Sequence, residues 1–382
     1  GAHRISGKRL PVHRTSPNRN FAPLVRGGAE LLPAAAAPLP SRVLCLHPGV
    51  ERAGLNGGGR GRGGGAGKAR PPGTERPRRQ GRGSIARVYT RDYVRVPFFV
   101  DLSRPQDVLN HTCSLYLNTE EDVWVGVWHT LPASQWEAAS GRGADWYQEA
   151  LGDGQPVIIY LHGNVGTRAL RHRVDLVKVL SAAGFHVLSL DYRGFGDSSG
   201  DPSEAGLTSD ALYLQQWVKR RGGGPVILWG HSLGSGVATN AAVRLQDGES
   251  AVDALVLEAP YTRIRDVAAN LLITKIYTFL PGLKNFLFDL LKKNQIEFAN
   301  DENLKTLTCP LLILHAEDDG VVPHHMGLQL QQISVEARRG LGEDAPVTMV
   351  SYPAELGFSH SSIYLDPNLP ATVQNFVQNL RR

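Results

Sequence analysis

The sequence predicts an α/β fold, with a mostly parallel central sheet and helices on both of its faces. Short apolar runs recur between residues 112 and 350, and segments of helical periodicity separate several of them. The runs at 157–161, 226–229 and 311–314 lack polar alternation, which is typical of strands buried on both faces. Strands that alternate with helices favour a parallel sheet, whose functional loops lie at the carboxyl ends of the strands.

Eight strands and four helices are expected in chain order. The first two strands are expected to be antiparallel, and the later ones central and buried. The expected strands are 113–117, 123–128, 157–161, 185–190, 226–229, 254–257, 311–314 and 347–350. The expected helices are 173–183, 209–221, a helix-like run at 235–242 and a closing helix that begins at residue 372.

Positive charge is concentrated in the N-terminal part of the chain. Residues 1–90 carry 17 Lys and Arg against 3 Glu, which leaves 24 basic and 33 acidic residues for the rest of the chain. Phe21 is the one aromatic residue before Tyr89, so this Gly- and Arg-rich segment has too little apolar surface to offset its chain entropy. We expect a disordered basic tail over 1–90 and a folded domain over 91–382.

The tail is compatible with peripheral contact to an anionic membrane or with RNA binding through Arg-Gly repeats. Because no further aromatic residues are interleaved with the arginines, nucleic acid is the less favoured partner. No run reaches the roughly 18 to 20 apolar residues of a membrane span. A peripheral membrane location, such as the endoplasmic reticulum surface, or a cytoplasmic one is therefore expected.

Cysteine and histidine usage points away from disulfide and metal chemistry. Cys45, Cys113 and Cys309 are few and widely spaced, which argues against a disulfide scaffold. No Cys/His cluster has metal-ligand spacing, and the adjacent pair His324 and His325 does not form one. The sequence predicts neither a metal nor a cofactor.

Residues 230–234 read G-H-S-L-G, between an apolar run and the helix-like run. A strand, a sharp turn with a central serine and a helix form the nucleophile elbow of an α/β-hydrolase. The glycines are needed there because a Cβ would collide with the neighbouring strand or helix. Ser232 is the candidate nucleophile. The pattern alone is also compatible with a Gly-Ser turn that has no catalytic role, so the motifs that follow in the chain decide between the two interpretations.

The acid that orients the base is expected in the loop after the strand 311–314. Asp319 is favoured because it stands three residues before Val322 and Pro323, the spacing usual for this fold. Asp318 is its rival.

The base is expected after the last strand, because the chain order of this fold is serine, acid, histidine. His360 fits this position. His324 and His325 compete through their proximity to Asp319 in the sequence, but they break that order.

Two backbone N–H groups must face the oxyanion that forms during acyl transfer. Leu233, at the positive end of the helix after the nucleophile, is expected to supply one. The loop 161–166 contains H-G-N and is expected to supply the other, from Asn164, with Val165 as the alternative. His162 is expected to pack inside the loop.

Several long motifs together make the chain similar to one family. The chain resembles the abhydrolase-domain-containing protein 12 family, the monoacylglycerol and lysophosphatidylserine lipases, over about residues 92–380. The motifs lie at 160–164, 191–194, 229–240, 298–303 and 315–319. The resemblance implies that Ser232, Asp319 and His360 form the catalytic triad. One member of that family has a transmembrane helix before the hydrolase domain. A basic segment stands there in this chain, which makes it look like the B paralogue without the anchor.

The function implied is that of a serine hydrolase that cleaves the acyl ester of monoacylglycerols or lysophospholipids through an acyl-enzyme. A cap insertion over about 261–308, with several apolar runs, is expected to accept the acyl chain. Two other functions compete with this one. The first is a protein S-acyl thioesterase (a depalmitoylase), and the second is a catalytically silent scaffold that binds membrane or RNA.

Overall fold

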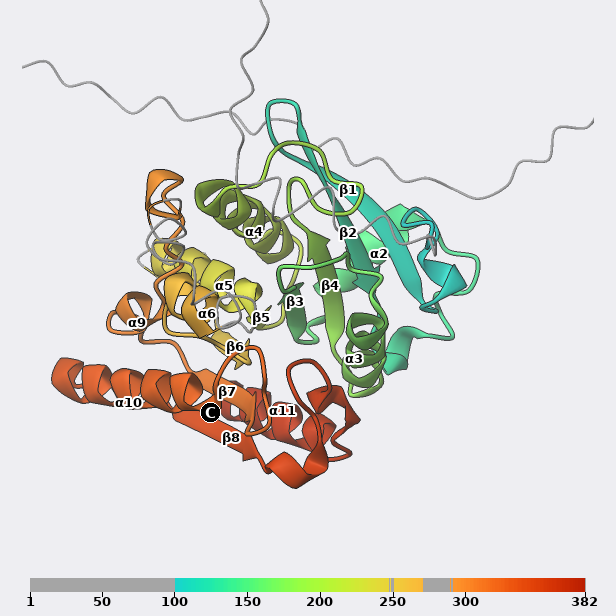
Figure 1. Cartoon of the computed structure of the whole chain (residues 1–382). Coiled ribbons are helices and arrows are strands. Elements are labelled where there is room, and N and C mark those ends of the chain that lie inside the picture. Colours follow the sequence, from blue (N-terminus) through green and yellow to red (C-terminus); the bar gives the residue numbers. More distant parts are fainter. Residues whose placement is uncertain (1–99, 247, 249–250, 271–288, 290, 382) are drawn as a thin grey trace, which may run out of the picture. The chain divides into compact units, whose positions relative to one another are not determined.

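An eight-stranded sheet forms the centre of the described part of the chain (Figure 1). The computed structural model describes residues 100–246, 248, 251–270, 289 and 291–381. The tail predicted over 1–90 and the apolar runs of the predicted cap insertion between 271 and 288 lie outside these residues. The strands are β1 (Thr112–Glu120), β2 (Val123–Thr130), β3 (Val157–Leu161), β4 (His186–Asp191), β5 (Val226–His231), β6 (Ala254–Glu258), β7 (Leu311–Ala316) and β8 (Val347–Tyr352).

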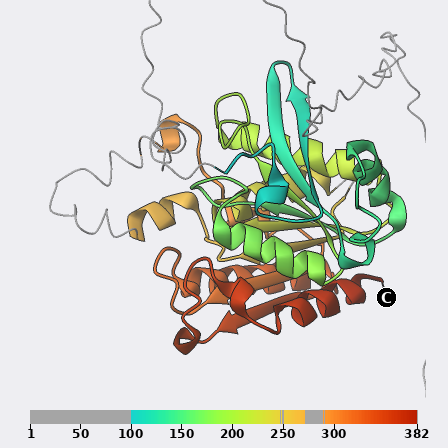
Figure 2. The same ribbon diagram turned by 90° about the vertical axis from the view of Figure 1, so that its right-hand side faces the viewer.

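The strand order places a crevice between β3 and β5. Neighbouring strands follow the order β1-β2-β4-β3-β5-β6-β7-β8, so β1 and β8 lie at opposite ends of the sheet (Figure 2). The pairs β1–β2 and β2–β4 are antiparallel, and the other pairs are parallel, which confirms the predicted sheet. The chain leaves β3 for β4 on one side and then crosses to β5 on the other. Ligands of such sheets bind where this reversal separates the carboxyl ends of adjacent strands.

Helices cover both faces of the sheet in the part that the structure describes. They are α2 (Ala144–Glu149), α3 (Arg171–Ala182), α4 (Glu204–Lys219), α5 (Leu233–Leu245), α6 (Ile264–Asn270), α9 (Asn300–Asn303), α10 (His324–Leu341) and α11 (Leu369–Gln378). Single 3-10 turns are η1 (Pro105–Asp107), η2 (Ala133–Gln135), η3 (Ala150–Asp153), η4 (Ala354–Leu356), η5 (Ile363–Leu365) and η6 (Asn379–Arg381). None of the helices within the described ranges is long and apolar enough to cross a bilayer.

The side-chain alternation of β3 divides the core into two layers. Val157, Ile159 and Leu161 belong to the buried cluster that also contains residues of α4, α5 and α10. Ile158 and Tyr160 point to the other face and belong to a second buried cluster, with residues of α3 and α11. All five side chains are buried, as expected for a central strand covered on both faces. The loops at the carboxyl ends of these strands therefore rest on a rigid base.

Candidate active site

Ser232 lies at the sharp turn between β5 and α5. Its backbone has φ 52° and ψ −116°, a conformation that only a few non-glycine residues of the described chain approach. Its N–H donates to the Glu258 carbonyl at 2.9 Å, and its own carbonyl accepts from the Ser235 N–H at 2.9 Å and the Ser235 Oγ at 2.7 Å. These bonds hold the strained turn, so the side chain projects at the carboxyl end of β5.

Asp319 and His360 form a hydrogen-bonded pair. His360 Nδ1 lies 2.7 Å from Asp319 Oδ2, and the carboxylate side chain is fully buried. Asp319 Oδ1 accepts from the N–H groups of Val321 and Val322 at 2.8 and 2.9 Å. Burial alone would raise the pKa of Asp319. The hydrogen bonds from His315, His360 and the Val322 N–H hold it well below its usual value. The carboxylate is thus charged and keeps a proton on His360 Nδ1.

The rival acid and base residues have other contacts. Asp318 Oδ1 accepts from the Ser359 N–H at 2.9 Å, one residue before His360. His324 begins α10, and its Nε2 lies 2.9 Å from Ser351 Oγ. Among the described residues, Asp319 is therefore the carboxylate that contacts the His360 ring.

His231 is a site residue that the sequence analysis did not single out. Its Nε2–H donates to the His360 carbonyl at 2.9 Å, and the two ring centroids lie 5.0 Å apart. Since a carbonyl only accepts, the proton sits on Nε2, and burial lowers the pKa of this imidazole well below its usual value. The residue before Ser232 thus connects the loop of His360 to the turn between β5 and α5. Its one signal in the sequence was its position as the residue before Ser232 in G-x-S-x-G.

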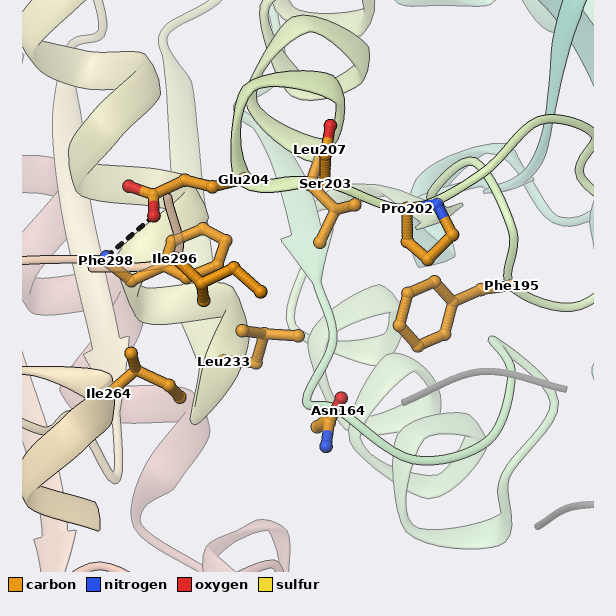
Figure 3. Close-up of a pocket in the computed structure, with 10 residues that line it drawn as sticks. All are labelled: Asn164, Phe195, Pro202, Ser203, Glu204, Leu207, Leu233, Ile264, Ile296 and Phe298. Carbon is orange, nitrogen blue, oxygen red and sulfur yellow. Dashed lines mark hydrogen bonds between the residues drawn. The ribbon is translucent and has the colours of Figure 1, made fainter. Parts of the chain in front are cut away.

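An apolar pocket opens beside the predicted oxyanion residues. Asn164, in the loop after β3, and Leu233, the first residue of α5, both line it (Figure 3). The space between these side chains, open solvent included, measures about 410 Å³. A Cβ on Gly163 would stand 3.3 Å from Ser232 Cβ, so the loop of Asn164 lies directly against Ser232. Val165, the alternative donor, has a side chain that points to solvent and is 58% exposed.

The rest of the pocket wall is formed largely by the start of α4 and by residues 296 and 298, at the end of the predicted cap insertion. Its apolar side chains come from Phe195, Leu207, Ile264, Ile296 and Phe298. Glu204 Oε2 accepts from the Phe298 N–H at 3.0 Å, the bond drawn in Figure 3, and also from the Glu297 N–H. This carboxylate therefore holds Glu297 and Phe298 against the start of α4.

Buried charges support the loop after β3 from below. Arg168 donates to Asp191 and to Asp197, each at 2.7 Å. Burial alone would raise the pKa of Asp191, but the Arg168 charge and the His162 contact lower it. These contacts give Asp191 and Asp197, in the segment 191–200, a structural role beneath the loop. In the described residues no group of three or more His, Cys, Asp or Glu gathers that could hold a metal ion.

Glu258, at the end of β6, is a buried carboxyl next to the site. Trp229 Nε1–H donates to its Oε2 at 2.8 Å. Burial raises the pKa of Glu258 to about 7, and this hydrogen bond only partly opposes the shift. The group therefore takes up a proton on folding at weakly acidic pH.

This proton predicts a pH-dependent stability. The ordinary pKa of a glutamate carboxyl is 4.5, and the pKa of Glu258 in the folded protein is about 7. Between these two pH values the folded protein holds a proton that the unfolded chain has lost. The free energy of unfolding should fall by roughly 3 kcal/mol as the pH rises through this window. Glu258→Gln keeps an acceptor for Trp229 but cannot bind the proton. In this variant the difference between the free energies of unfolding at pH 5 and pH 8, measured in urea, should become smaller than in the wild type. Glu355→Gln, at an exposed position, should leave this pH dependence unchanged. An equal pH dependence in both variants would contradict its assignment to Glu258.

Comparison with known proteins agrees with this architecture. The family profile described as "alpha/beta hydrolase fold" matches residues 156–280. The esterase Pf2001 of Pyrococcus furiosus superposes with a TM-score of 0.52 at 17% identity, over 72% of this chain and 92% of the esterase. Est1E of Butyrivibrio proteoclasticus superposes with a TM-score of 0.51 at 18% identity, over 70% of this chain and 98% of Est1E. Together, fold and site define the class: the chain is an α/β-hydrolase.

Relatives of known name narrow the class. The rat protein named lysophosphatidylserine lipase ABHD12 is 49% identical over 297 residues, which cover 77% of this chain and 74% of the rat protein. The Xenopus tropicalis protein of the same name is 51% identical over 288 residues, covering 75% and 74%. The human protein ABHD12B is 49% identical over 287 residues, covering 75% and 78%. The chain belongs to this ABHD12 family and is an ester-hydrolysing enzyme.

Proposed function

We propose that this enzyme cleaves the acyl ester of single-chain lipids, with lysophosphatidylserine and other lysophospholipids ahead of monoacylglycerols. The observation that carries the proposal is the apolar pocket lined by Asn164 and Leu233, which offers an acyl chain an apolar surface close to Ser232. Relatives at about 50% identity are named lysophosphatidylserine lipases, which supports lysophosphatidylserine as a substrate.

The first half of the reaction forms an acyl-enzyme. His360 Nε2 takes the proton from Ser232 Oγ as that oxygen attacks the acyl carbonyl carbon. The carbonyl oxygen becomes an oxyanion, which accepts from the N–H groups of Asn164 and Leu233. The C–O bond to the glycerol part then breaks, and the leaving oxygen receives the proton from His360.

The second half restores the enzyme. Water attacks the acyl-enzyme, and His360 takes a proton from that water and returns it to Ser232 Oγ as the fatty acid leaves. Asp319 keeps its charge throughout. Its bond to His360 Nδ1 holds the ring in the tautomer whose Nε2 can accept, and it stabilises the imidazolium.

The pocket predicts a chain-length effect. Ile296→Trp adds an indole to the pocket wall, so the long acyl chain should lose its room while a short ester keeps access to Ser232. We expect kcat/KM for a long-chain lysophospholipid to fall at least about tenfold relative to that for p-nitrophenyl acetate. The matched control is Ile333→Trp, at a partly buried position that lines a polar surface pocket formed with α6 and α9. An equal loss for both esters would place the acyl chain elsewhere.

Fluorophosphonate labelling followed by a substrate panel tests the function as a whole. The wild type should be labelled and Ser232→Ala should not, with release of fatty acid from lysophosphatidylserine and monoacylglycerol only in the wild type. Cleavage of acyl-cysteine peptides with both lipids untouched would establish the thioesterase reading instead. Equal labelling of wild type and variant would overturn the assignment of Ser232.

We further propose that the basic residues 1–90 bring the enzyme into peripheral contact with anionic membranes. They carry 17 Lys and Arg against 3 Glu, and this positive charge supports the proposal. Co-sedimentation of the full chain with vesicles that contain phosphatidylserine, at low and high salt, tests it, because screening should release the enzyme.

A further inference from the structure

Arg173, on α3, is a buried cation beneath the loop that follows β3. Its side chain is shielded from water, with the whole residue 2% exposed. Its guanidinium donates to three backbone carbonyls of that loop: Nη1 to Thr167 at 2.9 Å, and Nη2 to Gly163 at 3.3 Å and to Val165. In the described part of the chain no carboxylate hydrogen-bonds to it. Burial lowers its pKa, and Asp191 and Glu258 act on it only from a distance. Arginine stays charged even so.

The Gly163 carbonyl belongs to the same peptide group as the Asn164 N–H. That carbonyl accepts from two donors, Arg173 Nη2 and His162 Nδ1, the latter at 2.7 Å. A trans peptide is planar, so its C=O and N–H point in opposite directions. The two donors therefore direct the Asn164 N–H away from α3. Gly163 itself lies against Ser232, since a Cβ on it would stand 3.3 Å from Ser232 Cβ.

The same contacts change the strength of the N–H donor. A hydrogen bond to a carbonyl polarises its peptide group, and a cationic donor does so more strongly in a buried site. A polarised N–H binds an oxyanion better than it binds a neutral carbonyl oxygen, so the gain falls on the transition state.

We propose that Arg173 is a positioning residue of the oxyanion hole: it orients the Gly163–Asn164 peptide and strengthens its N–H towards the negative charge formed in the reaction. The inference rests on the proposed function, because it needs Ser232 to form a tetrahedral intermediate beside Asn164.

The chain contains a matched control at the other end of the sheet. Arg338, on α10, is also buried, at 3% exposed, and also donates to three backbone carbonyls. These belong to Cys309, Ala345 and Pro346, which precede β7 and β8 and so lie at the amino ends of the strands. In both arginines the Nε is buried without a partner. Loss of either guanidinium removes similar bonds, but only Arg173 reaches the peptide of Asn164.

The test compares Arg173→Met, Arg173→Lys and Arg338→Met with the wild type of the full chain. The substrate is p-nitrophenyl butyrate, and active sites are titrated to completion with a fluorophosphonate, so that kcat refers to folded enzyme only. Arg173→Met should lower kcat per active site about tenfold to a hundredfold, with KM within about threefold. Arg173→Lys, which keeps the charge, should recover part of the loss. Arg338→Met should reduce thermal stability and leave kcat per active site unchanged.

A trifluoromethyl ketone inhibitor gives a second readout, because its adduct with Ser232 carries an oxyanion. Its inhibition constant should rise by the same factor by which kcat/KM falls in Arg173→Met. If kcat per active site and the inhibition constant stay at wild-type values, Arg173 is only structural and the inference is overturned. If the wild type neither hydrolyses the ester nor is labelled, the proposed function itself fails.

Discussion

Asp319→Asn is expected to lower kcat for ester hydrolysis about ten-thousandfold, the loss typical when a triad carboxylate becomes an amide. The reason lies in the two N–H groups of Val321 and Val322, which already bind one side-chain oxygen of residue 319. They would hold the asparagine oxygen there and turn its NH₂ group towards His360 Nδ1. An amide donor at that place favours the tautomer with hydrogen on Nε2, which cannot accept the proton of Ser232.

Asp318→Asn is the matched control. Its side-chain oxygen can still accept from the Ser359 N–H, because an amide keeps one acceptor. We expect kcat to stay within about threefold of the wild type, because the partly exposed Asp318 makes no hydrogen bond to the His360 ring and polar changes near the surface usually shift free energies by only about 0.5 kcal/mol. Steady-state kinetics of both variants with p-nitrophenyl butyrate gives the answer. A larger loss from Asp318→Asn than from Asp319→Asn would reverse the assignment of the acid.

Gly234→Ala is expected to destabilise the fold by about 4 kcal/mol or more. A Cβ at this position would stand 1.9 Å from the Leu161 carbonyl oxygen, so β3 and the elbow would have to separate. Backbone atoms of a central strand cannot yield as a flexible side chain can. Urea unfolding of purified protein measures the loss, and ester hydrolysis should disappear with it.

Gly340→Ala is the control for the same change of residue. Gly340 lies in α10, and no atom stands within 4 Å of the Cβ that it would gain. Alanine is the better helix former, so the variant should be more stable by about 0.5 to 1 kcal/mol. If Gly234→Ala were as stable as Gly340→Ala, the close approach of the elbow to β3 would be wrong.

The sheet could be predicted because its strands are apolar runs too short for helices. The predicted runs 157–161, 226–229 and 311–314 became β3, β5 and β7, all with buried side chains. α4 begins at Glu204, five residues before its predicted start. Its N-terminus is set by a cap, Ser203 Oγ accepting from the Gly206 N–H at 3.1 Å, rather than by apolar periodicity.

α10 was not predicted, for a physical reason. Its buried face consists of Met326, Gly327, Leu330, Ser334 and Arg338. The spacing is helical, but three of the five residues are not apolar, so hydrophobic periodicity does not register them. Arg338 is buried because three carbonyls at the ends of other segments accept from it. The buried face of α10 thus depends in part on this tertiary contact rather than on apolar periodicity in the sequence.

By itself, the sequence determined the α/β-hydrolase fold, the elbow at Ser232 and the chain order of acid and base candidates, because these depend on residue type and local spacing. Tertiary structure alone decided which carboxylate meets which ring. His360 reaches Asp319 across 41 positions, and His231 reaches the His360 carbonyl across 129. It also decided the place of Arg173. The acceptors of this arginine are backbone carbonyls, which every residue carries, and only the folded loop aims them at one buried charge.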